Sequence, residues 1–213
     1  MRRIIQLAAV WVALMGLAAC LGLGSLPATS YFRLVGPSQC PPQPGSYPYV
    51  VAILPFRAPA VYQQTALLYR PSPFEVAFYG SSRWEAMPSE MLFERVRDYL
   101  EECRLFRQVT RYGLSSRPDL LLRSRITSFE EVDSPEGTWA ELGLEAELLC
   151  PQSAQLVWQG RLAARSPMNE RSPQELARAM SASLASVLGE MAQKLGPAVG
   201  RLEGRGCGES GSR

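Results

Sequence analysis

The side chains that could carry out chemistry in this 213-residue chain are five cysteines, twenty carboxylates and a single lysine. Histidine is absent, which excludes a Ser-His-Asp or Cys-His catalytic centre, a histidine-ligated metal ion and a histidine pH switch. The lysine, Lys194, lies near the end of a predicted helix, where a cation usually complements the helix dipole. No residue is therefore predicted to be catalytic, no metal or cofactor is expected, and the chain is not expected to be an enzyme.

Cys20 differs from the other cysteines because it follows an apolar run and two small residues. Together with Leu17, Ala18 and Ala19 it resembles a bacterial lipobox. In such a segment the thiol receives a diacylglyceryl group, and a peptidase then cuts in front of the cysteine. Each buried acyl CH₂ contributes about 0.8 kcal/mol, so two or three chains, palmitate among them, hold a protein on a membrane. Cys20 is the predicted lipid attachment site, and residues 1–19 are the predicted lipoprotein signal peptide.

Two other interpretations of the N-terminal segment stay open. Arg2 and Arg3 followed by an apolar run are also typical of a plain signal peptide. The stretch from Ile4 to Leu26 carries no charge and is just long enough for an uncleaved transmembrane anchor, which needs roughly 20 apolar residues. Its glycines and the following Pro27 weaken the second half of such a helix, so the lipobox interpretation is preferred.

The other four cysteines are candidates for disulfides. Export would place them in an oxidising space, and four cysteines can pair in three ways, among which the sequence does not choose. A Cys₄ zinc site is the alternative, disfavoured because no C-x-x-C pair is present. These residues are Cys40, Cys103, Cys150 and Cys207.

Hydrophobic periodicity predicts a short tether followed by strands and two helices. Residues 20–30 are expected to form the lipidated, flexible tether, and a helix is predicted to start at Pro88 or Ser89. Phe74, Val76 and Phe78 are expected on one face of a hairpin. The predicted strands span residues 31–35, 50–54, 66–70, 74–79, 106–110, 120–129, 139–150 and 155–165.

The last two strands are predicted to form a hairpin with one charged face. With a five-residue loop, Glu145 would face Arg161 and Glu141 would face Arg165. Such cross-strand pairs contribute roughly 0.2–1 kcal/mol each, so the acidic row, which includes Glu147, is interpreted as a solvated sheet face rather than a catalytic carboxylate pair.

The opposite faces of the same two strands are predicted to be apolar. Leu156, Trp158 and Leu162 are expected to point into the core from the second strand.

The final helix has the clearest boundaries in the sequence. Ser172 to Glu175 forms a capping box with proline at the first helical position. An apolar stripe from Leu176 to Leu195 follows, and Gly196-Pro197 is predicted to stop the helix. Residues 31–197 are therefore the predicted domain, and residues 198–213 the predicted glycine-rich, flexible tail.

The composition is that of a globular domain. The chain is 46% hydrophobic and 20% charged, and Arg2 and Arg3 account for its formal net charge of +2. A neutral mature chain with scattered arginines is not expected to bind nucleic acid. The predicted fold class is α/β (α+β), a mixed sheet with two helices.

The order of these parts resembles the ABC-type transport auxiliary lipoprotein family, outer-membrane lipoproteins that accompany Mce-type lipid transporters. The resemblance covers most of residues 20–197. It rests on the lipobox at Cys20, an aromatic strand beginning at Tyr31-Phe32, and Arg83-Trp84 with Pro88 before a helix. It implies a mixed sheet with two helices on one face, like the amino-terminal domain of TolB. Arg83, Trp84 and Pro88 would then be structural or contact a partner.

The resemblance implies a docking role rather than catalysis. The expected partners are an Mce-type periplasmic protein and an ABC permease/ATPase complex, and a homo-oligomer is left open. Leu21, where an aspartate would favour inner-membrane retention, indicates the periplasmic face of the outer membrane. The alternative is an assembly or scaffold lipoprotein of another envelope machine, such as a secretion pore or cell-wall synthase.

Overall fold

The computed structural model describes residues 28–37, 39–40, 45–114, 117–202 and 207. The predicted signal peptide, Cys20 and its lipobox, and most of the predicted tether lie outside the described residues. Apart from one 3₁₀ turn, η1 (Ala60–Tyr62), the described chain forms the strands and helices that follow: β1 (Ser30–Phe32), β2 (Tyr47–Ile53), β3 (Ala66–Ser72), β4 (Glu75–Trp84), α2 (Pro88–Glu102), β5 (Phe106–Arg111), β6 (Leu120–Ser134), β7 (Gly137–Leu149), β8 (Leu156–Pro167) and α3 (Pro173–Gly200).

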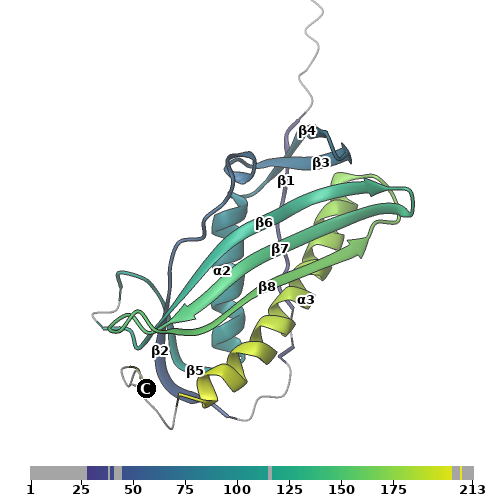
Figure 1. Cartoon of the computed structure of the whole chain (residues 1–213). Coiled ribbons are helices and arrows are strands. Elements are labelled where there is room, and N and C mark those ends of the chain that lie inside the picture. Colours follow the sequence, from purple (N-terminus) through teal and green to yellow (C-terminus); the bar gives the residue numbers. More distant parts are fainter. Residues whose placement is uncertain (1–27, 38, 41–44, 115–116, 203–206, 208–213) are drawn as a thin grey trace, which may run out of the picture.

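The strands form one eight-stranded mixed sheet, and both helices lie on the same face of it (Figure 1). The path runs β1-β4-β3-β6-β2-β5, while β7 pairs with β6 and β8 with β7. Pairing is antiparallel in β3–β4 and β6–β7–β8, and parallel elsewhere. The predicted fold class is confirmed.

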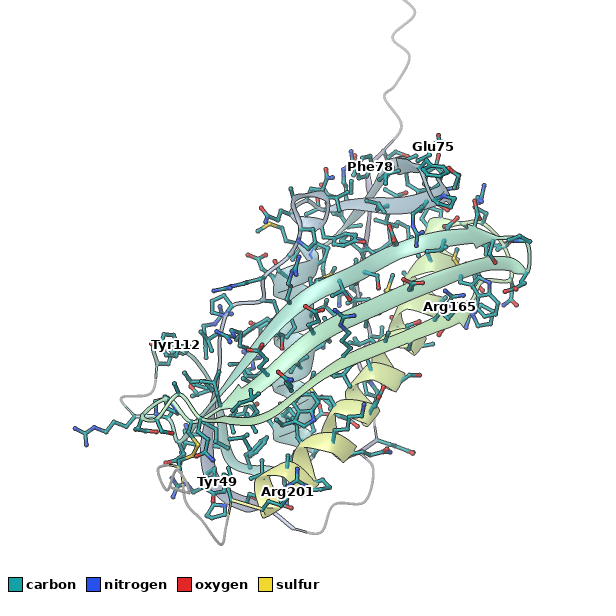
Figure 2. The ribbon with its side chains drawn as sticks, in the orientation of Figure 1. Tyr49, Glu75, Phe78, Tyr112, Arg165 and Arg201 are labelled. Carbon is teal, nitrogen blue, oxygen red and sulfur yellow. A yellow bond between two sulfur atoms is a disulfide. The ribbon has the colours of Figure 1, made fainter. Side chains whose placement is uncertain are left out.

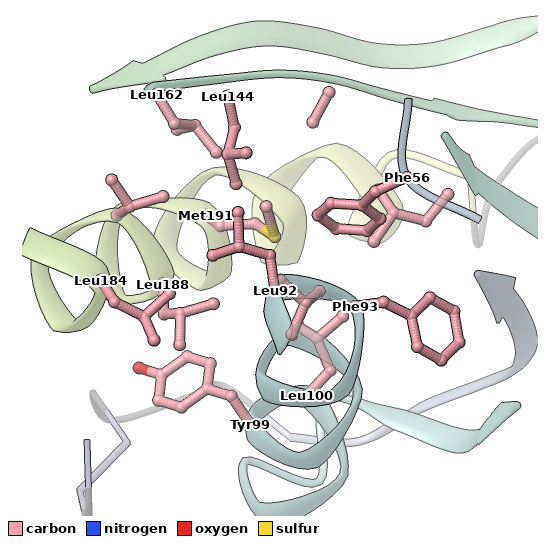
Figure 3. Packing of buried hydrophobic residues seen from close by; sticks show 14 of the residues in the cluster. Phe56, Leu92, Phe93, Tyr99, Leu100, Leu144, Leu162, Leu184, Leu188 and Met191 are labelled. Carbon is pink, nitrogen blue, oxygen red and sulfur yellow. The ribbon is translucent and has the colours of Figure 1, made fainter. Parts of the chain in front are cut away.

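The core lies between the helices and the sheet. Leu92 and Leu100 of α2 are fully buried where the helix meets Leu188 of α3, beneath Leu144 and Leu162 of the sheet (Figure 3). Fully burying such a side chain contributes about 1.5–3 kcal/mol, so these stripes stabilise the helices on the sheet.

Helix α3 begins at Pro173, as predicted, with Ser172 as its N-cap, but only the serine half of the predicted capping box forms. The hydroxyl of Ser172 accepts a hydrogen bond from the backbone N–H of Glu175 at 3.2 Å. The Glu175 carboxylate in turn accepts from Arg178 and from the backbone N–H of Asn169, and these contacts lower its pKa to about 2.

The predicted end of this helix is wrong. α3 continues through Pro197 to Gly200, so the predicted tail from residue 198 begins inside a helix. Pro197 has no N–H to donate, which costs one helical hydrogen bond. Ala198 and Val199, however, are 2% and 0% exposed, and their burial favours continuing the last turn. Leu202 is buried as well.

The outer face of the β7–β8 hairpin has the predicted register. Glu145 pairs with Arg161 and Glu141 with Arg165. The closest nitrogen–oxygen distances are 2.9 Å and 3.2 Å. All four side chains are at least partly exposed, so these pairs make small contributions, and the row is a solvated sheet face.

The prediction for one side chain of β8 is wrong. Trp158 and Leu162 lie on the core side, but Leu156 is 47% exposed. Leu148 pairs with Trp158 while its neighbour Leu149 pairs with Leu156, so the register shifts there. At this bulge Val157 is an extra residue of β8 with no partner on β7, and Leu156 therefore points to the opposite face of the sheet.

The cysteines form two disulfides, Cys40–Cys103 and Cys150–Cys207. The first joins the segment after β1 to the end of α2, and the second joins the end of β7 to the residues after α3. The structure thus selects one of the three pairings that the sequence left open. The alternative prediction of a Cys₄ zinc site is wrong, because all four thiols are used in disulfides.

Candidate functional site

Trp84, the aromatic residue of the Arg83-Trp84 motif, lies in the core. Its side chain is 1% exposed, and its ring centroid is 5.2 Å from that of Phe129 on β6, with the rings tilted at 61°. The backbone N–H of Trp84 donates to Thr65, and Trp84 pairs with Phe32 of β1. Trp84 therefore joins three strands at the point where β4 ends.

Arg83 binds the backbone of its own strand. Its Nη1 donates to the carbonyls of Tyr79, Gly80 and Ser82 at 2.8–3.1 Å. These bonds span the part of β4 in which the β3–β4 register shifts, between the pairs Leu68–Phe78 and Ala66–Arg83. Pro88 is buried at the first position of α2, where a missing N–H is tolerated. The three motif residues thus follow one another along β4 into α2, and none of them points into a common pocket.

A second group of polar side chains lies beneath the β3–β4 hairpin. Glu131 of β6 is 0% exposed, and its Oε2 accepts a hydrogen bond from the hydroxyl of Tyr79 at 2.6 Å. Its other oxygen lies 3.1 Å from Nε of Arg171, which also pairs with Asp133. The ring of Tyr69 packs against that of Tyr79 at a tilt of 60°, with centroids 5.3 Å apart. These contacts attach the hairpin to β6 and to the segment before α3.

The neighbouring Glu130 makes a separate set of contacts. It accepts a hydrogen bond from Nε of Arg70 at 3.1 Å. Burial is the main cause that raises the pKa of Tyr62 to about 12, and the charge of Glu130 is the second cause. Consecutive residues of a strand point to opposite faces, so Glu130 and Glu131 do not form a carboxylate pair. Their arrangement suits the anchoring of a hairpin, not general acid–base chemistry.

Burial raises the pKa of the Glu131 carboxyl, against the lowering effects of the Tyr79 hydrogen bond and of Arg171. Burial and the same hydrogen bond raise the pKa of the Tyr79 hydroxyl, which keeps it a donor. The folded protein therefore holds the Glu131 proton at pH values at which the unfolded chain has already lost it. This contribution to stability is complete below the ordinary value of 4.5 and is lost as the pH rises through the folded pKa.

The Glu131→Gln variant tests this sign. We expect the free energy of unfolding of the wild type, relative to the variant, to fall as the pH is raised from 4.5 through the folded pKa. Urea unfolding at a series of pH values measures it, and Glu136→Gln at an exposed turn serves as the control. A relative stability that rises with pH over this range would show that the contacts stabilise the charged carboxylate.

These buried carboxylates are not among the residues that the sequence pattern indicates. The predicted strand ends at Phe129, whereas β6 continues to Ser134 and turns at once into β7. The alternation that marks a half-exposed strand stops here, because residues 128–132 are buried on both faces. The partners Arg70, Tyr79 and Arg171 are 40 to 60 positions away, so no local pattern signals them.

No three histidine, cysteine or acidic side chains in the described part of the chain come together as metal ligands. Neither described helix combines the length and the apolar character of a membrane span.

Comparisons with known proteins agree with the fold. Protein XCC0632 from Xanthomonas campestris superimposes with a TM-score of 0.76 at 18% identity, over 83% of this chain and 99% of that one. Protein CT253 from Chlamydia trachomatis does so with a TM-score of 0.51 at 10% identity, over 72% and 98%. At such identities the likeness shows the fold alone.

Sequence comparisons point to one family. No curated protein sequence matches the chain. A family model described as "ABC-type transport auxiliary lipoprotein component" matches residues 32–192. This range runs from β1 into α3 and includes Trp84 and the buried carboxylates of β6.

Proposed function

The chain belongs to the family of ABC-type transport auxiliary lipoprotein components, and on this premise we propose that it is a lipid-anchored, non-catalytic accessory subunit of an ABC-type transport system in the cell envelope. The match of the family model to residues 32–192 is the observation that carries this proposal. In this role the folded domain binds the transport machinery, and the acyl chains on Cys20 hold it at one membrane.

Two features of the chain support export and anchoring. The Leu17-Ala18-Ala19-Cys20 segment has the residue types that lipidation requires and stands shortly before the domain. The disulfides Cys40–Cys103 and Cys150–Cys207 suit an oxidising compartment outside the cytosol, since thiols are kept reduced inside it.

The finer part of the proposal concerns place and partners. We infer that the mature chain sits on the periplasmic face of the outer membrane, because Leu21 rather than aspartate follows Cys20. There it docks an Mce-type periplasmic protein that shields lipid between an inner-membrane permease/ATPase and the outer membrane. Genes for a permease, an ATPase and an Mce protein beside this one favour lipid transport, whereas genes of a different envelope machine count against it.

The Cys20→Ser variant tests the anchor. It removes the predicted attachment site but touches no described strand or helix. We expect cells fed an alkyne analogue of palmitate to label the wild type but not the variant. We also expect the variant to leave the outer-membrane fraction and transport to fall, because a bridge across the periplasm needs a fixed end.

The matched control is Ser25→Ala, which alters the tether and leaves the lipobox intact. It should be labelled and fractionate like the wild type. An unlabelled wild type, or a soluble Cys20→Ser protein that supports full transport, would contradict the proposed anchor.

A further inference from the structure

The tip of the β3–β4 hairpin presents apolar side chains to solvent. Here "hairpin tip" means residues 71–79. Phe74, in the turn before β4, is 98% exposed. Val76 and Phe78 are 48% and 43% exposed, and the alternation places these two on one face of β4. Glu75 carries the only charge in the hairpin tip. Figure 2 shows Glu75 and Phe78 at the end of the molecule that carries β1, β3 and β4.

The apolar row continues a buried one. Phe78 pairs across the hairpin with Leu68, which is 3% exposed and belongs to the core. Beyond this pair the hairpin closes at Ser72 and Glu75, and nothing in the described chain covers Phe74. An apolar surface of this kind is typical of a contact with another apolar phase.

The direction in which the chain enters β1 indicates that this apolar phase is a membrane. β1 runs parallel to β4, with Ser30 beside Ser82 and Phe32 beside Trp84. The chain before Ser30 therefore leaves the domain toward the side on which β4 begins, which is the side of the hairpin tip. The predicted lipid attachment site, Cys20, precedes this point along the chain.

The lengths of the two segments are comparable. Cys20 precedes Ser30 by ten residues, a path of at most about 35 Å. Phe74 precedes Ser82 by eight residues, at most about 28 Å along β4. With Cys20 at a bilayer surface, the tether keeps the hairpin tip within reach of the same bilayer.

The hairpin is also held firmly at its base. Tyr79 donates to the buried Glu131, Arg70 donates to Glu130, and Tyr69 pairs directly with Glu131 in the sheet. The hairpin therefore moves with the domain, and a contact at its tip orients the whole domain.

We propose that the hairpin tip inserts into the phospholipid bilayer that holds the acyl chains of Cys20, as a second membrane contact. Phe74, Val76 and Phe78 enter the boundary between headgroups and acyl chains, and Glu75 stays among the hydrated headgroups. Together the tether and the hairpin tip define how the domain faces the periplasm. This inference rests on the lipid anchor proposed above.

The Phe74→Trp variant of the full-length lipidated protein tests the contact. It is reconstituted into vesicles of phosphatidylethanolamine and phosphatidylglycerol, with or without brominated acyl chains, which quench nearby indoles. We expect a shift of emission to shorter wavelength and roughly twofold quenching of the added tryptophan, since insertion reaches the acyl boundary. The wild type gives the baseline from the native tryptophans. The control is Tyr112→Trp, at an exposed position (53%) away from the hairpin tip (Figure 2).

Flotation of the same samples separates the two proposals. Protein that floats with the vesicles while Trp at position 74 stays unquenched and open to iodide overturns the membrane contact and leaves the anchor intact. A blue shift without quenching by brominated lipid means that another copy of the chain covers the hairpin tip, and it also overturns the contact. Protein that does not float overturns the anchor and the inference together.

Discussion

Replacing Trp84 with alanine is expected to lower the free energy of unfolding by roughly 3–5 kcal/mol, the usual cost of removing a large buried aromatic side chain. Trp84 is 1% exposed and packs on Phe129, so the surrounding strands cannot close the cavity without moving β4 or β6. Urea unfolding followed by circular dichroism measures the change. The loss is large beside the 5–15 kcal/mol by which most domains are stable.

The matched control is Phe74→Ala, which removes an aromatic residue that is 98% exposed and should change stability by no more than about 0.5 kcal/mol. If Trp84→Ala unfolds like the wild type but no longer binds a partner, then Trp84 acts as a contact residue and its packing role is refuted.

Removing the Cys40–Cys103 disulfide is expected to cost roughly 4 kcal/mol, because the bond closes a long loop in the unfolded chain. The two residues are 63 positions apart. The Cys40→Ala/Cys103→Ala double variant, unfolded under non-reducing conditions, measures the effect.

The second disulfide provides the comparison. Cys150 and Cys207 are separated by 57 positions, so the loop argument predicts a similar loss for Cys150→Ala/Cys207→Ala. Peptide mapping of the unreduced protein should recover both pairs. A different pairing, or a Cys40→Ala/Cys103→Ala variant as stable as the wild type, would contradict the disulfide bonding described here.

Much of the fold is predictable because its signals are local. The acids of one strand and the arginines of the next predict the register of β7 and β8, since charges at even spacings along each strand identify the solvent face. The same holds for the start of α3, where Ser172 and Glu175 act within one turn.

The sequence-based predictions are wrong or incomplete where the local structure depends on contacts with residues far away in the chain. The end of α3 depends on the burial of Ala198 and Val199, which outweighs the local effect of Pro197. Leu156 faces outward because of a bulge that exists only in the pairing of β7 with β8. Both disulfides join segments more than fifty positions apart, and sequence spacing does not select among three pairings.

The candidate site divides in the same way. The importance of Arg83, Trp84 and Pro88 is visible as a motif, but their packing is not. The buried Glu131 has no local signal at all, because Tyr79 and Arg171 come from separate elements. Cys20 remains a prediction from its lipobox.

Affinity purification of the tagged, full-length protein from its own cells, in mild detergent, tests the central claim most directly. With the wild type as bait, we expect to recover the permease and ATPase of an ABC system and an Mce-type periplasmic protein, in constant ratios to the bait. It predicts that they are recovered less with Cys20→Ser, which does not sit at the membrane. Recovery of another envelope machine in their place, or of no transport component at all, would contradict the proposed function.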